Sequence, residues 1–299
     1  MRIAPVSQGI LRQRLEGLNQ IPTIPAVLAP LLHYLEKPVE QIDVQKVTDF
    51  LAQDKSLAAQ CLRMANSPLF GHWKKVESLR AAVLSLGFHH VSDIAMSCGM
   101  LNMFPGNKTG LDPAVFWEHA LGCALVCRRL ARDIHLPDPG KAYLAGLLHD
   151  LGIIVNLWVL PEEFRGVFEI AKAGGVPLHE AEQDSLGFTH CDSGRLLAEN
   201  WGLPSDLIHV IAYHHSPEES PENAELVALV HVADLLCRMS GLNHGYAELR
   251  QWNLFEDQGF ALLAKNFASM KQLDWARLTF ELDSYLDEVH VLVRSIYRA

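Results

Sequence analysis

The chain has 299 residues, of which 49% are hydrophobic, and this length and composition can bury one large core or two modest ones. Its formal charge of −10 and isoelectric point of about 5.8 argue against nucleic-acid binding, which usually needs a basic face. The six cysteines form no CxxC pair, and the N-terminus has no apolar signal-peptide core. We therefore expect a soluble, cytoplasmic protein with reduced thiols.

Apolar residues recur at helical spacing through the first third of the chain. This spacing predicts a helix over 26–35, and Asp43 and Asp54 stand where they can cap the next two helices. Another helix begins after Ser78, and a further one covers about 91–102.

The stretches 78–87 and 88–100 together resemble a helix-turn-helix, with Gly87 as the stop of the first helix. An ordinary αα-hairpin fits an acidic chain better. We therefore expect no nucleic-acid partner.

The segment PGNKTGLDP at 105–113 is rich in turn formers and is the best linker in the chain. Beyond it, Pro and Gly separate further apolar helical patterns. The helices expected there cover 114–133, 141–160, 162–173, 179–184, 189–201, 205–215, 224–239, 256–269 and 275–297. The predicted fold class is all-α.

The most apolar stretch, AYLAGLLHDLGIIVNLWVL at 142–160, is nearly long enough to cross a bilayer at about 1.5 Å per residue. His149 and Asp150 lie side by side near its middle, where they would be costly in lipid, and no basic flank marks a cytoplasmic side. We interpret the stretch as a helix buried in a soluble core, and we expect no membrane partner. An unpaired buried carboxylate is expensive, so Asp150 must be paired or bound to a metal.

Several other predicted helices carry His or Asp on an otherwise apolar face. These residues are His119, His190, His214 with the adjacent His215, and Asp234. A single histidine of this kind would be an ordinary hydrogen-bonded core residue, but several in one chain indicate a shared site. Cys123 and Cys127 lie one helical turn apart, a spacing that could bind metal, but core cysteines are the better interpretation.

The order His…His-Asp…His…His-His…Asp resembles that of the HD superfamily of metal-dependent phosphohydrolases, and the sequence is most similar to the HDOD branch. The resemblance covers about residues 15–240. It rests on the segments IPTIPAV (21–27), QDKSLAAQCLRMANSPLFG (53–71), ESLRAAVLSLG (77–87), AYLAGLLHDLGIIV (142–155), LHEAEQDSLGFTHCDSGRLLAENWGLP (178–204) and IAYHHSPEE (211–219).

The HDOD resemblance implies an N-terminal helical lobe packed on an HD-like helical bundle. On this chain the lobe would be 1–105, the bundle 106–240, and a C-terminal helical extension 241–299. Members of the family are bacterial signalling output modules.

A metal site is also implied by resemblance to binuclear HD enzymes. One ion would be held by His119, His149, Asp150 and Asp234. Asp150 would bridge to a second ion held by His190 and His214, with His215 as a further candidate. Mixed imidazole and carboxylate donors suit Fe, Mn, Zn or Ni, and no organic cofactor is expected. The alternative is a buried polar network satisfied by mutual hydrogen bonds.

Two departures argue against hydrolysis of cyclic di-GMP. Phosphodiesterases of the HD-GYP type continue His-Asp-x-Gly-Lys, and their Lys meets the substrate phosphate. Here Ile153 takes that place, and Ser-Pro-Glu-Glu at 216–219 replaces the GYP loop. A site without that cation is poorly built to neutralise charge on a phosphoryl group.

The leading hypothesis is a bacterial, cytoplasmic signal-transduction module of HDOD type that acts mainly by protein–protein interaction and has a mono- or binuclear metal site. The alternative is a metal-dependent phosphohydrolase acting on a nucleotide or other small phosphoester. In that case a metal-bound hydroxide would attack, and Asp150 would be the catalytic bridging residue. The sequence indicates no oligomeric state.

Overall fold

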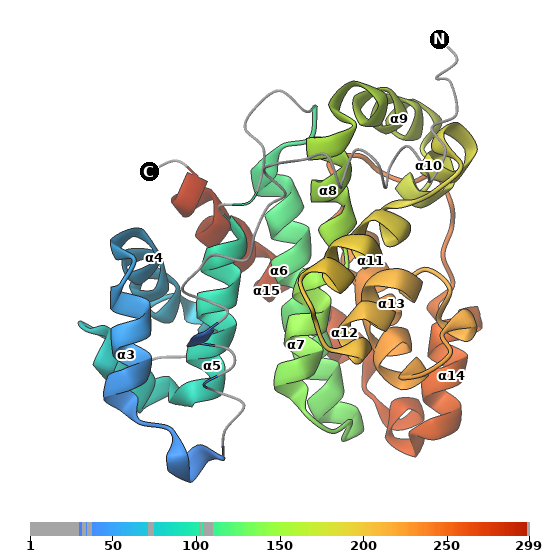
Figure 1. Ribbon diagram of the computed structural model, residues 1–299. Helices are drawn as coiled ribbons and strands as arrows, with labels where there is room; N and C mark the ends of the chain where they lie inside the picture. The colour runs from blue at the N-terminus through green and yellow to red at the C-terminus, as the bar shows by residue number, and fades with distance from the viewer. Residues whose placement is uncertain are drawn as a thin grey trace. The chain divides into compact units, whose positions relative to one another are not determined.

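The computed structural model describes residues 30–31, 34, 38–70, 75–101, 103 and 110–297, and every regular element in this part of the chain is a helix (Figure 1). The predicted all-α fold is confirmed. The motif at 21–27, most of the helix expected over 26–35 and the linker residues 105–109 lie outside the described residues.

The chain divides into two compact units. Among the described residues, the first unit comprises 110–283, and the second comprises those up to 103 together with 284–297. The last helix, α15 (Trp275–Tyr297), contributes to both. The three-part division at 105 and 240 stays a prediction.

Two capped helices begin the second unit. Asp43 caps α3 (Val44–Ala52) by accepting a hydrogen bond of 2.7 Å from the backbone two residues on. Asp54 caps α4 (Lys55–Ala65) in the same way at 2.8 Å. Each carboxylate satisfies a backbone N–H that has no partner within its helix, so both predicted caps are confirmed. The short 3₁₀ turns of this unit are η1 (Val39–Gln41) and η2 (Pro68–Phe70).

The third helix of this unit, α5 (Leu79–Leu101), packs on both α3 and α4. Gly87 interrupts it with a φ of 79°, a conformation that glycine adopts without steric cost. The two helices expected over 78–87 and 88–100, with Gly87 as the stop of the first, are therefore confirmed. The non-helical φ of 79° and ψ of 166° at Gly87 separate a helix before it from a helix after it within α5.

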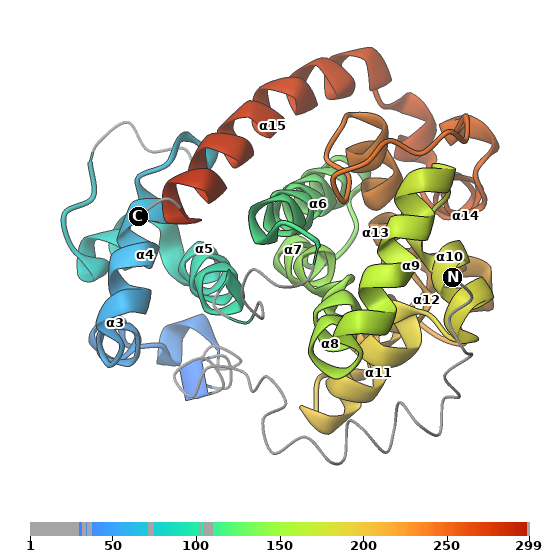
Figure 2. The same ribbon diagram turned by 90° about the horizontal axis from the view of Figure 1, so that it is seen from above.

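The first unit is built around α6 (Pro113–Ile134) and α7 (Pro139–Leu148), which lie side by side in both views (Figures 1 and 2). The long helix α13 (Ala224–Met239) packs against both. The remaining elements are α8 (Leu151–Val159), α9 (Pro161–Gly174), α10 (Leu178–Leu186), α11 (His190–Asn200), α12 (Ser205–Tyr213), η3 (Pro217–Glu219), η4 (Leu254–Glu256), α14 (Gln258–Asn266) and η5 (Ala268–Gln272).

The single helix predicted over 141–160 is in fact two helices, α7 and α8, and this corrects the sequence interpretation. The break falls at His149 and Asp150, where Asp150 adopts φ −92° and ψ 14°, in the bridge region. Apolar residues continue on both sides, so hydrophobic periodicity cannot reveal the break. The span Pro139–Val159 is long and apolar enough for a membrane, but 89% of its most apolar window is buried within the protein, as in a core helix.

Helices α8 and α11 approach each other closely because glycines face each other at their contact. A Cβ on Gly152 would overlap the backbone carbonyl of His190, and a Cβ on Gly194 would lie 2.6 Å from the Ile211 side chain. This contact brings the start of α11 against the break that carries Asp150.

Gly152→Ala should destabilise the fold by about 3 kcal/mol or more, because the backbone of α11 would have to move to admit the methyl group. Gly174→Ala, whose Cβ would meet only the Val176 side chain at 3.7 Å, is the matched control and should be neutral or stabilising. Thermal unfolding of both variants checks this. Equal melting temperatures for Gly152→Ala and the parent protein would contradict the close approach.

Candidate metal centre

All seven predicted ligand residues lie together in the first unit. They come from the middle of α6 (His119), the α7–α8 break (His149 and Asp150), the start of α11 (His190), the end of α12 (His214 and His215) and α13 (Asp234). Six of them are buried, and His215 is partly exposed. Their role as metal ligands stays a prediction, whereas their convergence is a property of the fold.

In three histidines, a backbone carbonyl shows which ring nitrogen carries the proton. Nδ1 of His119 lies 2.7 Å from the Leu242 carbonyl, and Nδ1 of His149 lies 2.8 Å from the Gly146 carbonyl. Nδ1 of His214 lies 3.2 Å from two carbonyls of α12. A carbonyl only accepts hydrogen bonds, so each Nδ1 carries the proton. In the neutral ring, Nε2 then presents a lone pair.

The fourth histidine, His190, is oriented by a carboxylate instead. Its Nδ1 lies 2.6 Å from Oε2 of Glu182, and the same oxygen accepts from its backbone N–H at 2.8 Å. Glu182 is fully buried and is held from its other oxygen by Asn156 at 3.0 Å. A carboxylate behind an imidazole fixes its tautomer and raises its basicity as a ligand.

The Nε2 atoms of these rings face one another at short range. His119 and His149 are 3.3 Å apart at Nε2, His190 and His214 are 3.4 Å apart, and His190 and His215 are 3.1 Å apart. Two lone pairs at such distances repel unless a cation lies between them. The arrangement therefore requires either protons or metal ions.

The Asp150 carboxylate separates these donors into two groups. Its Oδ2 lies 3.2 Å from Nε2 of His149 and 3.4 Å from Nε2 of His119. Its Oδ1 lies 3.3 Å from Nε2 of His190 and 3.5 Å from Nε2 of His214. One oxygen serves each group, as a carboxylate bridging two ions would.

Asp234 joins the first group, with Oδ1 3.3 Å from Nε2 of His119. Both oxygens of Asp234 also meet Arg238: Oδ1 accepts from Nε at 3.0 Å, and Oδ2 lies 2.9 Å from Nη2. Two carboxylates and the facing Nε2 atoms of His119 and His149 converge in this buried group, which needs compensating positive charge. The residues therefore fit a metal in this group, because a cation would satisfy the facing lone pairs and the carboxylate oxygens beside them together.

The electrostatics of the site call for positive charge. Burial raises the pKa of Asp150, but the surrounding imidazoles, His149 first, outweigh burial and hold that pKa well below its usual value. Burial lowers the pKa of His119, yet its contacts with Asp150 and Asp234 hold it well above its ordinary value. Metal ions can supply this charge in place of protons.

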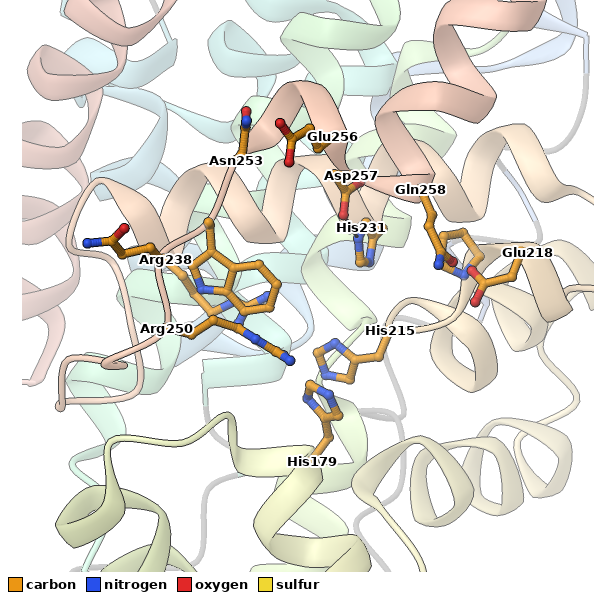
Figure 3. A pocket seen from close by; sticks show the side chains of 13 residues that line it. His179, His215, Glu218, His231, Arg238, Arg250, Asn253, Glu256, Asp257 and Gln258 are labelled. Atoms are coloured by element: carbon orange, nitrogen blue, oxygen red, sulfur yellow. Dashed lines mark hydrogen bonds and ion pairs between the residues drawn. The ribbon is translucent and has the colours of Figure 1, made fainter.

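A pocket of about 410 Å³ adjoins the donor set, and His215 belongs to both (Figure 3). The ring of His179 stacks on that of His215 at 3.9 Å, and the Arg250 side chain extends toward this pair. The opposite wall carries the acids Glu218, Glu256 and Asp257. Burial lowers the pKa of both His179 and His215, so this side of the pocket has neutral imidazoles beside Arg250, while the other side is acidic.

Sequence reasoning missed two buried groups of the site. Glu182 lies in a short predicted helix, and its spacing of eight residues before His190 gave no signal. His244 lies outside all predicted helices, yet its Nε2 is 2.9 Å from Oδ2 of Asp150. A loop residue has no periodic pattern from which burial can be predicted.

A family model described as the HDOD domain matches residues 21–217. The chain belongs to the HDOD family. Among solved structures it is similar to an HDOD domain protein of unknown function from Geobacter sulfurreducens, with 27% identity and a TM-score of 0.83 over 96% of this chain and 97% of that one. It shares its fold with a putative phosphohydrolase from Shewanella amazonensis, at 22% identity and a TM-score of 0.72 over 96% of this chain and 98% of that one.

Two curated relatives are similar in sequence to part of this HDOD chain. An uncharacterized protein of Treponema pallidum is 25% identical over 75% of this chain, which spans 43% of that protein. Ribonuclease Y of Nitratidesulfovibrio vulgaris is 31% identical over 51% of this chain, which spans 23% of the enzyme. The predicted HDOD resemblance is confirmed, and the family match ends before Asp234 and His244.

Glu182→Gln should weaken metal binding by about 10- to 100-fold, because His190 loses the carboxylate that fixes its ring. Glu180→Gln is the matched control: that residue lies on the same helix, its side chain is 42% exposed, and it pairs with Arg250 at 2.7 Å. Titration of chelator-treated protein with Zn²⁺ or Mn²⁺ measures both variants. Equal affinity of Glu182→Gln and the parent protein would contradict this role.

Proposed function

We propose that this HDOD protein is a signal-transduction module whose helical bundle holds two transition-metal ions, and that it acts mainly by contacts with another protein. The observation that carries the metal centre is the division of the Nε2 atoms between the two oxygens of Asp150. His119, His149 and Asp234 would hold one ion, and His190, His214 and His215 would hold the other, with Asp150 between them.

The chemistry of the donor atoms limits which metal ions can bind. Imidazole and carboxylate ligands suit Fe, Mn, Zn or Ni, while hard cations such as Mg²⁺ prefer oxygen alone. In a signalling module the ions would connect helices α6, α8, α11, α12 and α13 in one folded arrangement. Binding to the folded state alone stabilises that state, so metal occupancy would set how firmly these helices pack.

A signalling role is favoured over catalysis by Ile153, which takes the place of the phosphate-binding Lys of HD-GYP enzymes. Ile153 is fully buried in α8, so its side chain cannot meet a bound phosphate. The only polar side chain of α8 in the described residues is Asn156, and it is engaged with Glu182. The exposed apolar side chains of α15, including Phe280 and Val291 at 75% and 70% exposure, are available to a protein partner.

Elemental analysis tests this proposal, on protein purified without chelator or metal-affinity resin. About two equivalents of transition metal are expected, and stripping them should lower the melting temperature, since a ligand at 1,000 times its Kd contributes about 4 kcal/mol. Asp150→Asn should lose both ions because it removes the charge that both groups share.

The matched control is Asp184→Asn, an exposed aspartate of α10 that should keep the metal content of the parent protein. Metal content that Asp150→Asn leaves unchanged would contradict the proposal. So would an unchanged melting temperature after confirmed metal removal.

A second candidate, a metal-dependent phosphohydrolase, is favoured by the pocket beside His215. When bound, the ions would activate water and neutralise a phosphoryl group. Arg250 pairs with Glu180 at 2.7 Å and extends toward His215. It offers the pocket a cation that Ile153 cannot supply. Similarity to ribonuclease Y over half the chain supports phosphoester chemistry as the class to test.

A panel of nucleotides and small phosphoesters with Mn²⁺, Fe²⁺ or Ni²⁺ distinguishes the two candidates. If the protein is a hydrolase, Asp150→Asn should abolish turnover and Arg250→Gln should raise KM about 10-fold, whereas Arg132→Gln on the exposed face of α6 should change neither. Turnover that persists in Asp150→Asn would place the activity elsewhere. If the protein binds two ions but hydrolyses none of these substrates, the hydrolase candidate fails and the signalling role stands.

A further inference from the structure

The segment that follows α13 carries a buried histidine beside the metal centre. His244 is 8% exposed, its Nε2 lies 2.9 Å from Oδ2 of Asp150, and its ring centre lies 4.6 Å from that of His119. The family match ends at residue 217, so this histidine lies outside the part of the chain that defines the family.

We infer that His244 is an additional ligand of the ion held by His119, His149 and Asp234, and that the segment 242–246 thereby closes this side of the metal centre. The inference rests on the metal centre proposed above. It concerns the first ion alone, since Oδ2 of Asp150, the oxygen that His244 meets, faces the first group of donors.

The backbone of this segment is fixed at both ends, which holds His244 in place. The carbonyl of Leu242 accepts from Nδ1 of His119 at 2.7 Å, so the segment already positions one ligand. Gly245 turns the chain with a φ of 91°, and the hydroxyl of Tyr246 donates to the Val176 carbonyl at 2.9 Å. A loop held in this way can offer a ligand with little loss of conformational entropy.

Within the part of the chain that the structure describes, no partner at Nδ1 fixes the tautomer of the His244 ring. Nδ1 of His119, His149 and His214 each has a carbonyl partner, but among the described residues Nδ1 of His244 forms no hydrogen bond. The ring can therefore carry its proton on Nδ1 and present the Nε2 lone pair without losing a hydrogen bond there. His119, Asp150 and His244 also place their donor atoms within 4.8 Å of one another, within reach of one ion.

With His244 included, the two groups of donors become unequal. The first has five donor residues, His119, His149, Asp150, Asp234 and His244, and all five are buried. The second has four, His190, His214, His215 and Asp150, and its His215 borders the pocket. The first ion would then be closed in by protein, while the second would keep positions for water or a small ligand.

The competing interpretation is that His244 only donates a hydrogen bond from Nε2 to Asp150. Two substitutions separate these roles. His244→Gln keeps an amide donor of similar reach but offers a poor metal ligand, whereas His244→Ala removes both functions and leaves space for free imidazole. His209→Ala, a partly exposed histidine of α12, is the control.

The experiment is a titration of chelator-treated protein with Co²⁺, whose visible absorption reports the number and type of its ligands. The parent protein and His209→Ala should take up two equivalents. In both His244→Ala and His244→Gln, one equivalent should bind at least 10-fold more weakly and with an altered spectrum, and imidazole should restore the spectrum of His244→Ala. Melting temperatures of the cobalt-free variants check that they fold.

Two results would overturn the inference in distinguishable ways. In the first, the parent protein binds two ions, and either both His244 variants match it in affinity and spectrum or His244→Gln regains the affinity and spectrum that His244→Ala loses. His244 is then a hydrogen-bond donor, and the metal centre stands without it. If the parent protein binds no cobalt, the metal centre itself fails, and the inference fails with it.

Discussion

The buried carboxylate of Asp150 is the constraint on which the rest of the first unit depends. Asp150 is 2% exposed, and its carboxylate lies between two sets of imidazole Nε2 atoms, most of whose rings are oriented by hydrogen bonds at Nδ1. Such a group needs compensating positive charge. The helix break at His149–Asp150 places both side chains in the centre, and the facing glycines of α8 and α11 bring His190 within reach of them.

Much of the fold could be predicted from the sequence, because apolar residues at helical spacing and capping residues such as Asp43 act locally. Four of the seven ligand candidates follow from a related reason, because a His or Asp on an apolar helix face must point inward. These four are His119, His190, His214 and Asp234. The ligand set as a whole is implied by the resemblance to binuclear HD enzymes. The break between α7 and α8 could not be found in this way, since the residues on both sides are uniformly apolar. Glu182 and His244 were missed because tertiary contacts alone bring them to the site.

The centre extends beyond the residues that define the family. The HDOD match ends at 217, whereas Asp234 lies in α13 and His244 in the segment after it. Asp234 is also held by Arg238, which pairs with Glu248 at 2.9 Å, so this later part of the chain both contributes buried polar groups to the candidate centre and orients them. The pocket beside His215 also has Arg250 and Trp252 from the same part of the chain.

The most direct test of the two-ion centre is X-ray diffraction from crystals of the purified protein, measured at the absorption edge of the metal found in it. A two-ion centre should give two anomalous peaks, one on the Oδ2 side of Asp150 near His119 and His149, and one on the Oδ1 side near His190 and His214. An ordered Asp150 that keeps its contacts to the imidazoles, with no anomalous peak on either side, would show a hydrogen-bonded polar core and contradict the two-ion centre.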